Sequence, residues 1–438
     1  MAASLFSSPL YAQLFPTGDV GRLWTDSAEI RAMLLVEGAL ATAQGKLGVI
    51  PETSAKAIDR ASKEVAIDPA SLAEPTGRNG VNVPGLIAAF RKEMSAPEHA
   101  NFVHWGATSQ DIIDTALMLR LRQTLAILEA RLTEVLGTLA QMAREHAETP
   151  ILARTYGQHA TVTTFGAVVA QWGQPLQNQR EALAALRAGA LMVSLSGAAG
   201  TASALPRAQD TRALLAEALN LKDPQYAWHT DRGPILRIAT WMADTVSALG
   251  HMGRTLTLLS GSDLGEVGFG QSGASSTMPQ KSNPVGASAL VALETQMAGL
   301  MANLRAAANH DYQRDGAAWF AEWLTLPSIA LSCASALQIA GALRVMPNPK
   351  RMADNLSHDN GMTSAEALSF ALCADHSRST AQALTKDLVA KAVAEGRPLE
   401  DVARAAHPNL PQGLFDPLQN LGDAPSFARA FADRAQQG

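Results

Sequence analysis

A long heptad seam limits the folds available to this chain more than any other feature of its sequence. Between Leu121 and Met142 the apolar residues alternate spacings of four and three over three repeats. This pattern is typical of a helix that packs along its length against other helices. The seam predicts one helix from Thr108 to about Glu148, which would be about 60 Å long.

Other segments are also helical in character, and we find no alternation of the kind expected of strands. Asp26 and Glu29 have the spacing of a capping box, at the start of a helix that runs to about Val49. Four further long helices are predicted: from after residues 154–160 to about Ala188, from Pro234 to Leu258, from Pro284 to about Asn309, and over residues 322–344. The expected fold is all-α, with a central bundle of long helices.

The length of 438 residues exceeds what one hydrophobic core usually serves. From about Pro347 the sequence changes to shorter helices and loops. We therefore expect three domains: an N-terminal helical domain over residues 1–105, the central long-helix bundle over residues 106–346, and a small C-terminal helical domain over residues 347–438.

Composition limits the partners and the location of the protein. The hydrophobic fraction is 47% and the charged fraction only 17%, which indicates that other subunits cover part of the surface. A net charge of −5 without a basic stripe argues against a nucleic-acid partner. Two cysteines, Cys333 and Cys373, are too few for a disulfide framework or a zinc cluster. Together with an N-terminus unlike a secretory signal, they favour the cytoplasm.

One uncharged segment is long enough to span a bilayer. Residues 323–343 carry no charge. They include several serines, a threonine, a proline and a glutamine, which are too polar for contact with lipid. We interpret the segment as a buried helix and expect no membrane partner.

The segment from Gly261 to Asn283 has the composition of a mobile lid. It holds five glycines, two adjacent hydroxyls at Ser275 and Ser276, and Lys281. Pro284 is well suited to open the helix that follows, whose free amides and dipole favour anions. The segment therefore predicts a site that stabilises developing negative charge.

Three polar clusters lie at the ends of predicted long helices. They are H-W-G-A-T-S-Q-D (residues 104–111), R-T-Y-G-Q-H-A (154–160) and the lid. In an antiparallel bundle, helix ends of neighbouring subunits can meet, so the clusters could form one site in an oligomer.

Simpler interpretations stand beside the functional ones. Thr108, Ser109 and Asp111 could simply cap a helix, and capping is compatible with binding a carboxylate. His159 could be a hydrogen-bonded core imidazole or could act on a substrate. The lid could be a solvated linker, but its glycines, paired hydroxyls and lysine together favour a function.

The lid sequence G-A-S-S-T-M-P-Q-K-S-N-P (273–284) resembles the fumarase/aspartase superfamily signature G-S-S-x-M-P-x-K-x-N. Residues 104–111 and 154–160 resemble the first and second conserved regions of the superfamily, and residues 24–51 resemble the N-terminal part of its adenylosuccinate-lyase-like branch. The resemblance implies a three-domain fold and a homotetramer with each active site built from three subunits. It implies a small polycarboxylate substrate and no cofactor or metal.

The resemblance also implies roles for individual residues. Ser275 matches the catalytic serine, which exchanges the proton on the carbon beside a carboxylate, and Lys281 matches the lysine that stabilises the aci-carboxylate intermediate. His159 in the second region is a further catalytic candidate. The remaining candidates would bind substrate: Thr108, Ser109, Tyr156, Gln158, Arg232, Ser276, Met278, Asn283 and Arg314. Ala274 replaces a small residue of the signature, a change expected to be harmless.

Tyr156 narrows the range of superfamily reactions that the sequence predicts. Lyases that expel an amine have a histidine at this position, after R-T, whereas a carboxylate leaves as an anion without a proton. An aromatic residue here, followed by Q-H-A, resembles the bacterial 3-carboxy-cis,cis-muconate cycloisomerases, as do W-H-T-D-R (228–232) and W-F-A-E-W (319–323). The resemblance implies reversible lactonisation to 4-carboxymuconolactone in protocatechuate degradation, with closure of the lid over the site.

Three alternatives remain open at this point. The chain could be a lyase of the adenylosuccinate or argininosuccinate type, with His159 or His104 as the acid. It could act on a sulfonated muconate, because a site for anions could take a sulfonate in place of a carboxylate. It could also be a non-catalytic helical scaffold, although the presence of Ser275, Lys281 and Asn283 argues against that interpretation.

Overall fold

The computed structural model describes residues 4–270, 273–274, 278 and 281–437, and it confirms the all-α fold. The chain divides into two compact units. Unit 1 contains residues 1–131, 179–247 and 292–339, and unit 2 contains residues 132–178, 248–291 and 340–438. The three-domain division expected from the sequence stays a prediction.

Five long helices make up the middle of the chain. The seam residues lie on α7, and six of them, from Leu121 to Leu139, are buried, as the heptad pattern predicts. Pro284 directly precedes α11, and Pro234 is the second residue of α10, as expected of prolines that open helices. The five are α7 (Ser109–Glu145), α8 (Phe165–Ala190), α10 (Gly233–Leu259), α11 (Val285–Ala307) and α12 (Gly316–Ala342).

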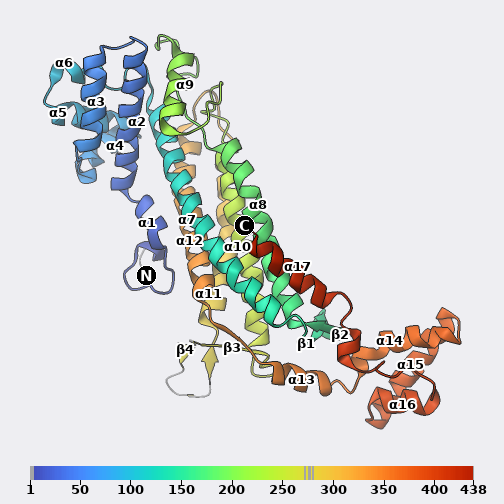
Figure 1. Cartoon of the computed structure of the whole chain (residues 1–438). Coiled ribbons are helices and arrows are strands. Elements are labelled where there is room, and N and C mark those ends of the chain that lie inside the picture. The colour runs from blue at the N-terminus through green and yellow to red at the C-terminus, as the bar shows by residue number, and fades with distance from the viewer. Residues whose placement is uncertain (1–3, 271–272, 275–277, 279–280, 438) are drawn as a thin grey trace. The chain divides into compact units, whose positions relative to one another are not determined.

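Unit 1 also contains shorter helices, all of which precede α7 except α9, and α2 packs against α3 and α9 (Figure 1). Thr25, and not Asp26, caps α2, since its hydroxyl accepts from the Ala28 amide at 3.2 Å. The predicted capping box of Asp26 and Glu29 was wrong, because the Glu29 carboxylate instead accepts hydrogen bonds from Asn82 Nδ2 and Arg120 Nη1. These helices are η1 (Leu5–Ser7), α1 (Gly18–Leu23), α2 (Asp26–Lys46), α3 (Glu52–Glu64), η2 (Pro69–Leu72), α4 (Ala73–Asn79), α5 (Val83–Glu93), α6 (Pro97–Ala100) and α9 (Ala208–Leu219).

Short strands occur in unit 2, contrary to the sequence-based expectation. The second polar cluster forms a β-hairpin, in which Tyr156 and Gly157 make a two-residue turn with φ of 52° and 74°. Turns with positive φ at both central residues match the twist of paired strands. The antiparallel pairs are β1 (Pro150–Thr155) with β2 (Gln158–Thr164), β3 (Val267–Phe269) with β6 (Val345–Pro347), and β4 (Gly273–Ala274) with β5 (Ser282–Asn283).

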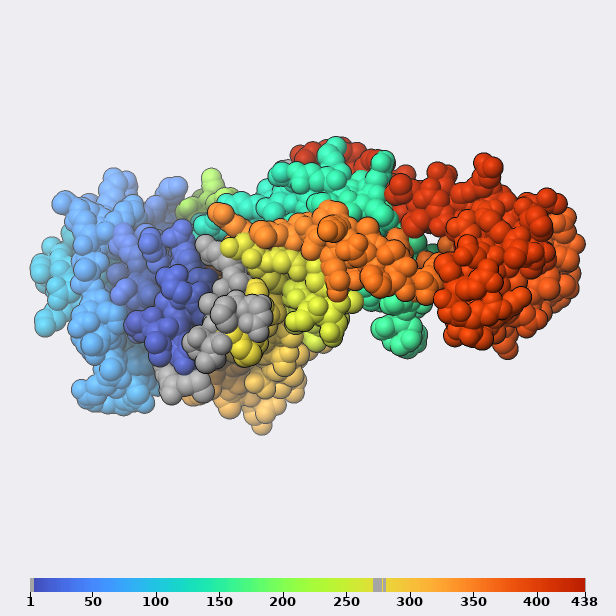
Figure 2. All heavy atoms as spheres, turned by 90° about the horizontal axis from the view of Figure 1, so that it is seen from below, coloured from blue at the N-terminus to red at the C-terminus, as the bar shows by residue number. Residues whose placement is uncertain are grey.

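The C-terminal part of unit 2 has a small core of its own. Leu368, Leu388, Leu399 and Val402 lie in this core, and α14, α15 and α16 gather around it (orange and red in Figure 2). The helices of this part are α13 (Pro349–Ser357), η3 (Met362–Ser364), α14 (Ala365–Ala371), η4 (Leu372–Ala374), α15 (Arg378–Glu395), α16 (Leu399–Ala406), η5 (Pro417–Asn420) and α17 (Ala424–Gln436).

Two helices, α11 and α12, are long and apolar enough to cross a membrane by length and composition. In α12, 61% of the most apolar window is buried inside the protein, as in a core helix. In α11 only 33% of that window is buried. Cys333 and Cys373 are both free thiols, so they form no disulfide with each other.

Candidate functional site

Candidate residues occur in both units. Thr108, Ser109, Arg232 and Arg314 belong to unit 1. The hairpin with Tyr156, Gln158 and His159, and the lid with Met278, Lys281 and Asn283, belong to unit 2. Each unit therefore holds one part of the predicted site.

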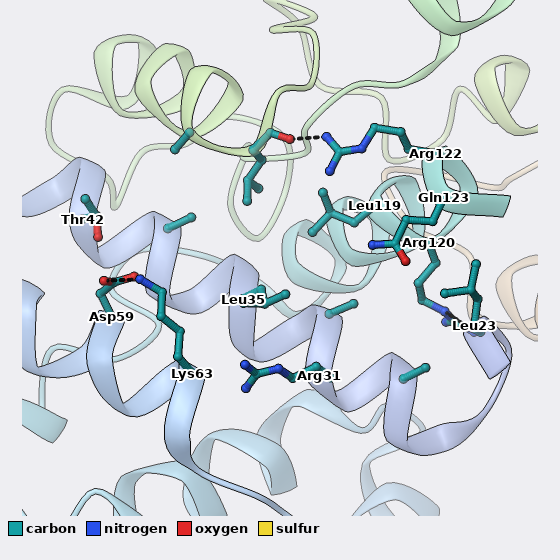
Figure 3. Close-up of a pocket in the computed structure, with 15 residues that line it drawn as sticks. Leu23, Arg31, Leu35, Thr42, Asp59, Lys63, Leu119, Arg120, Arg122 and Gln123 are labelled. Carbon is teal, nitrogen blue, oxygen red and sulfur yellow. Dashed lines mark hydrogen bonds and ion pairs between the residues drawn. The ribbon is translucent and has the colours of Figure 1, made fainter. Parts of the chain in front are cut away.

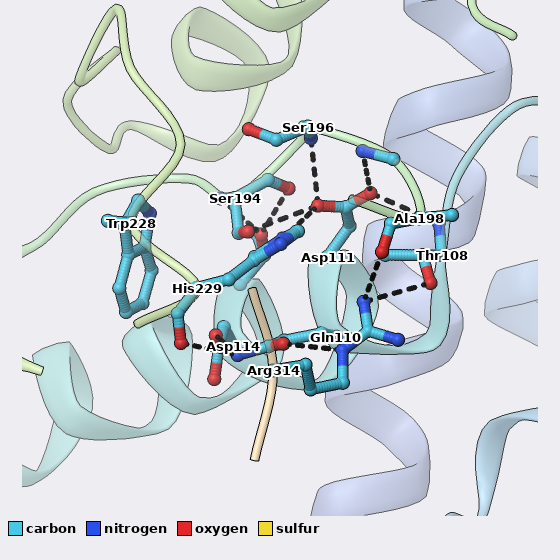
Figure 4. A network of polar contacts seen from close by, with 12 residues as sticks. Thr108, Gln110, Asp111, Asp114, Ser194, Ser196, Ala198, Trp228, His229 and Arg314 are labelled. Atoms are coloured by element: carbon cyan, nitrogen blue, oxygen red, sulfur yellow. Dashed lines mark hydrogen bonds and ion pairs between the residues drawn. The ribbon is translucent and has the colours of Figure 1, made fainter. Parts of the chain in front are cut away.

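In unit 1, a buried carboxylate organises the start of α7 (Figure 4). Asp111 Oδ2 accepts the Thr108 amide at 3.1 Å, which is the return bond of a capping box. The same carboxylate accepts the Ser196 and Gly197 amides at 2.8 and 2.9 Å and His229 Nε2 at 2.9 Å. The Ser194 hydroxyl adds a further bond at 3.1 Å. Asp111 thus binds two distant segments, the loop at residues 194–197 and His229, to the start of α7.

The backbone beside this carboxylate requires glycine. Gly106 has φ of 75°, and a Cβ there would come within 2.9 Å of the Leu205 side chain and 3.2 Å of the Ala204 carbonyl oxygen. A residue with a side chain would therefore push the cluster at residues 104–111 away from the loop that follows α8.

Arg314 joins the start of α7 to the same loop. Its Nε donates to Gln110 Oε1 at 2.9 Å, and its Nη2 donates to Thr108 Oγ1 at 3.3 Å and to the Ala198 carbonyl at 3.2 Å. Arg314 is half-buried, and no described residue accepts a hydrogen bond from its Nη1. Thr108 and Arg314, predicted independently from the sequence, thus lie in contact, with a guanidinium donor left for an anion. Ser109 is the first residue of α7 and is half-buried.

Arg232 has a different environment from the one expected of a substrate clamp. It is fully buried between Asp114 and Glu322, with four hydrogen bonds of 2.7 to 2.9 Å to their carboxylate oxygens. Burial alone would lower the pKa of Arg232, but the two carboxylates outweigh burial, so the pKa is raised. This geometry favours a structural ion pair, and contact of Arg232 with substrate stays a prediction.

In unit 2, the hairpin projects its turn into solvent. The Tyr156 side chain is completely exposed, and Gln158 and His159 on β2 are exposed as well. Arg154 is anchored by both oxygens of buried Glu266, at 2.8 and 2.9 Å. His159 Nδ1 lies 2.6 Å from Asp359 Oδ1. The Tyr156, Gln158 and His159 side chains are thus open to solvent, although one edge of the His159 ring meets Asp359.

Only part of the lid is described. Met278 and Lys281 are exposed, and Asn283 is half-buried on β5. The Lys281 amide donates to the Met278 carbonyl at 3.0 Å. The predicted residues Ser275 and Ser276 lie outside the described residues. Among glycines 261, 265, 268 and 270, only Gly265 has a positive φ, so the other three do not use the conformational freedom that the sequence suggested.

A cavity of about 570 Å³ lies elsewhere in unit 1, between α2, α7 and α9 (Figure 3). None of the predicted site residues lines it. Its cations have partners within the unit: Lys63 binds Asp59 at 2.7 Å, and Arg122 donates to the Leu219 carbonyl at the end of α9. This cavity is therefore separate from the candidate site. Among the described residues there is also no group of metal-ligating side chains.

Comparison of the chain with known proteins shows the family to which it belongs. A family model described as Lyase matches residues 17–299. A 3-carboxy-cis,cis-muconate cycloisomerase of Pseudomonas aeruginosa is 36% identical over 98% of this chain and 96% of its own length. The chain belongs to the fumarase/aspartase superfamily of lyases.

Two further superfamily members are informative. The crystal structure of the 3-carboxy-cis,cis-muconate lactonizing enzyme from Pseudomonas putida matches with a TM-score of 0.91 and 33% identity, over 98% of this chain and 99% of that one. A nitrosuccinate lyase of Streptomyces davaonensis is 34% identical over 94% of this chain and 91% of its own length. Similarity over nearly the whole length means that both units are shared with these superfamily members.

Several residues that contact the candidate site residues were not predicted from the sequence. Asp111 was predicted as a helix cap, a role compatible with carboxylate binding, and no role in the site was predicted for Asp359, Glu266 or the loop at residues 194–197. The motif letters around Asp111 and the small residues of the loop were visible signals. Nothing local pointed to Asp359, which lies 200 residues from His159.

Proposed function

We propose that this chain is a 3-carboxy-cis,cis-muconate cycloisomerase that forms 4-carboxymuconolactone reversibly. The observation that carries the proposal is similarity over the whole chain, at 36% identity, to a protein of that name. Tyr156 supports it, because an anionic leaving group needs no proton from a histidine at that position. The substrate would be a small polycarboxylate, and no cofactor enters the reaction.

The Thr108 and Arg314 contact supports a role in binding one substrate carboxylate. Arg314 Nη1 and the Thr108 hydroxyl offer charge-assisted and neutral hydrogen bonds within a single half-buried group. Ser109 at the start of α7 would add the helix dipole to this group. Gln110 holds Arg314 from the side, which fixes the direction of the guanidinium.

The chemical step follows from the placement of charge. A carboxylate oxygen of the muconate adds to a conjugated double bond, and the electron pair moves to the distant carboxylate, giving an aci-carboxylate. Lys281 and Asn283 would stabilise that charge, and Ser275 would give its proton to the adjacent carbon. His159, Tyr156, Gln158, Ser276 and Met278 would line the remaining walls, and closure of the lid would exclude water.

A homotetramer with composite sites is part of the proposal. The apolar helix α11 is only one-third buried within one chain, and the Tyr156 side chain is completely exposed. Both features are expected where further copies cover a surface. Light scattering after size-exclusion chromatography should give the mass of four chains. A cytoplasmic location is likewise proposed, and cell fractionation would test it.

The reaction can be tested with a panel of substrates. Purified protein would be assayed by ultraviolet absorbance with 3-carboxymuconate, 3-sulfomuconate, adenylosuccinate and nitrosuccinate. We expect 3-carboxymuconate to give the highest kcat/KM and the product to be 4-carboxymuconolactone by NMR. Ser275→Ala should remove most turnover and keep the oligomeric mass of the wild type. Preference for adenylosuccinate or nitrosuccinate would contradict the proposal.

A further inference from the structure

Two buried carboxylates hold the hairpin in unit 2. Glu266 binds Arg154 through both oxygens and also accepts Asn355 Nδ2 at 2.9 Å. Asp359 binds His159 at 2.6 Å. Arg154 and His159 lie opposite each other in the register of the hairpin, so the two carboxylates act on neighbouring points.

The ion pairs of Arg154 with Glu266 and of His159 with Asp359 differ in how much of the cationic side chain stays exposed. Arg154 is largely buried, and Glu266 binds it through both of its oxygens. His159 is half-exposed, with 51% of its side chain accessible, although its partner Asp359 is only 5% exposed. A pair that only fastened the strand would gain nothing from an open imidazole edge, and Glu266 already fastens the strand.

Local packing sets the His159 ring against Asp359. Leu152 of β1, Val162 of β2 and Leu356 of α13 form one small apolar cluster. Asp359 follows α13, and its Oδ2 accepts the Thr363 amide at 2.7 Å. The carboxylate is therefore held by the backbone of η3 on one side and meets the imidazole on the other.

The hydrogen bonds of Asp359 indicate which nitrogen of His159 carries a proton. An ionised carboxylate only accepts hydrogen bonds, and one oxygen of Asp359 already accepts the Thr363 amide. The contact with His159 therefore needs a proton on Nδ1, which leaves Nε2 at the open edge of the ring. Asp359, bound at Nδ1, thus leaves Nε2 of His159 as the nitrogen available to another molecule.

We propose that Asp359 is a positioning residue, which fixes the tautomer and direction of His159 so that Nε2 faces the substrate. This inference rests on the proposed function, because it assumes a substrate at the hairpin. It assigns a part in catalysis to the segment between α13 and η3, where the sequence showed no motif. Asp359 itself touches no substrate in this proposal and acts only through His159.

A double-mutant cycle separates positioning from structural support. Asp359→Asn should lower kcat for 3-carboxymuconate by about 10-fold or more, with KM within about twofold, which is the size of effect found for groups that orient metal-binding histidines. In a His159→Gln background the same substitution should change kcat by less than about twofold, because the residue through which it acts is gone. Asp433→Asn, which breaks the exposed ion pair with Arg144, is the matched control and should leave kcat unchanged.

The outcomes are distinct. Equal loss of kcat from Asp359→Asn in both backgrounds would overturn the proposal and indicate a structural role, as would full activity of the single variant. Wild-type kcat in His159→Gln would also overturn it, while leaving the proposed reaction intact. Failure of the proposed reaction would instead appear as a wild-type protein without turnover. A crystal structure of Asp359→Asn gives a readout without turnover, since we expect the His159 ring to leave the orientation of the wild type, and an unchanged ring would contradict the proposal.

Discussion

The start of α7 and the hairpin of β1 and β2 both surround buried carboxylates, but they differ in where their remaining donors point. Around Asp111, every hydrogen bond comes from unit 1, and the polar groups enclose one another. Around Asp359 and Glu266, the hairpin is anchored at its base and presents Tyr156, Gln158 and His159 to solvent. The first region is thus preformed within a chain, whereas the second leaves these side chains open to solvent.

Replacing Arg232 should have the largest effect on stability. The same experiment tests whether this predicted substrate clamp is a structural ion pair. Arg232→Ala would leave Asp114 and Glu322 buried without their cation, so we expect the free energy of unfolding to fall by about 3–5 kcal/mol. Urea denaturation measures this loss. A well-folded variant whose only defect is a raised KM would show instead that Arg232 binds substrate.

Asp111 tests the preformed region directly. Asp111→Asn keeps the shape but replaces an acceptor by a donor that faces the Gly197 or Ser196 amide, so we expect a loss of about 2–3 kcal/mol. Denaturation midpoints compare this variant with Asp359→Asn, which should lose less because its partner His159 is half-exposed. Equal losses would remove the distinction between the two regions.

Arg314 should affect binding and not stability. Arg314→Lys keeps the charge but loses the planar fork that contacts Gln110 and Thr108, so KM should rise by about 10- to 100-fold with a small change in Tm. Steady-state kinetics and thermal denaturation provide the two readouts. Arg237→Lys, at an exposed arginine of the same unit, is the control and should match the wild type. An unchanged KM in Arg314→Lys would exclude this guanidinium from the site.

A smaller effect concerns pH at the first polar cluster. Burial alone would lower the pKa of His104, but Glu37 at 2.7 Å, helped by Asp111, outweighs burial and raises the pKa above 6.5. The native state therefore binds the proton more tightly than the unfolded chain, so this stabilisation is complete below pH 6.5 and is lost as pH rises through the raised value. Between about pH 6 and pH 9, the Tm of the wild type should fall by about 2 °C more than that of Glu37→Gln. Parallel Tm curves would contradict this assignment.

The sequence predicted features whose signals are local. Pro234, Pro284 and the heptad seam placed long helices correctly, because helix starts and apolar periodicity depend on nearby residues. The hairpin was missed although Tyr156 and Gly157 form a two-residue turn before the β-branched residues of A-T-V-T-T. The pairs of Arg232 with Glu322 and of His159 with Asp359 could not be predicted, since tertiary packing alone brings these residues together.

In the proposed tetramer, the preformed region of one chain and the unit 2 residues of another, in the hairpin and the lid, complete each site. Co-expression of Arg314→Ala, defective in unit 1, with Lys281→Ala, defective in unit 2, tests it most directly. If sites draw on different chains, some sites in mixed tetramers hold neither defect, and activity should return to about one quarter of the wild type although each variant alone is inactive. If each site belonged to a single chain, every site would carry one defect. Mixed protein as inactive as its parents would therefore contradict the account.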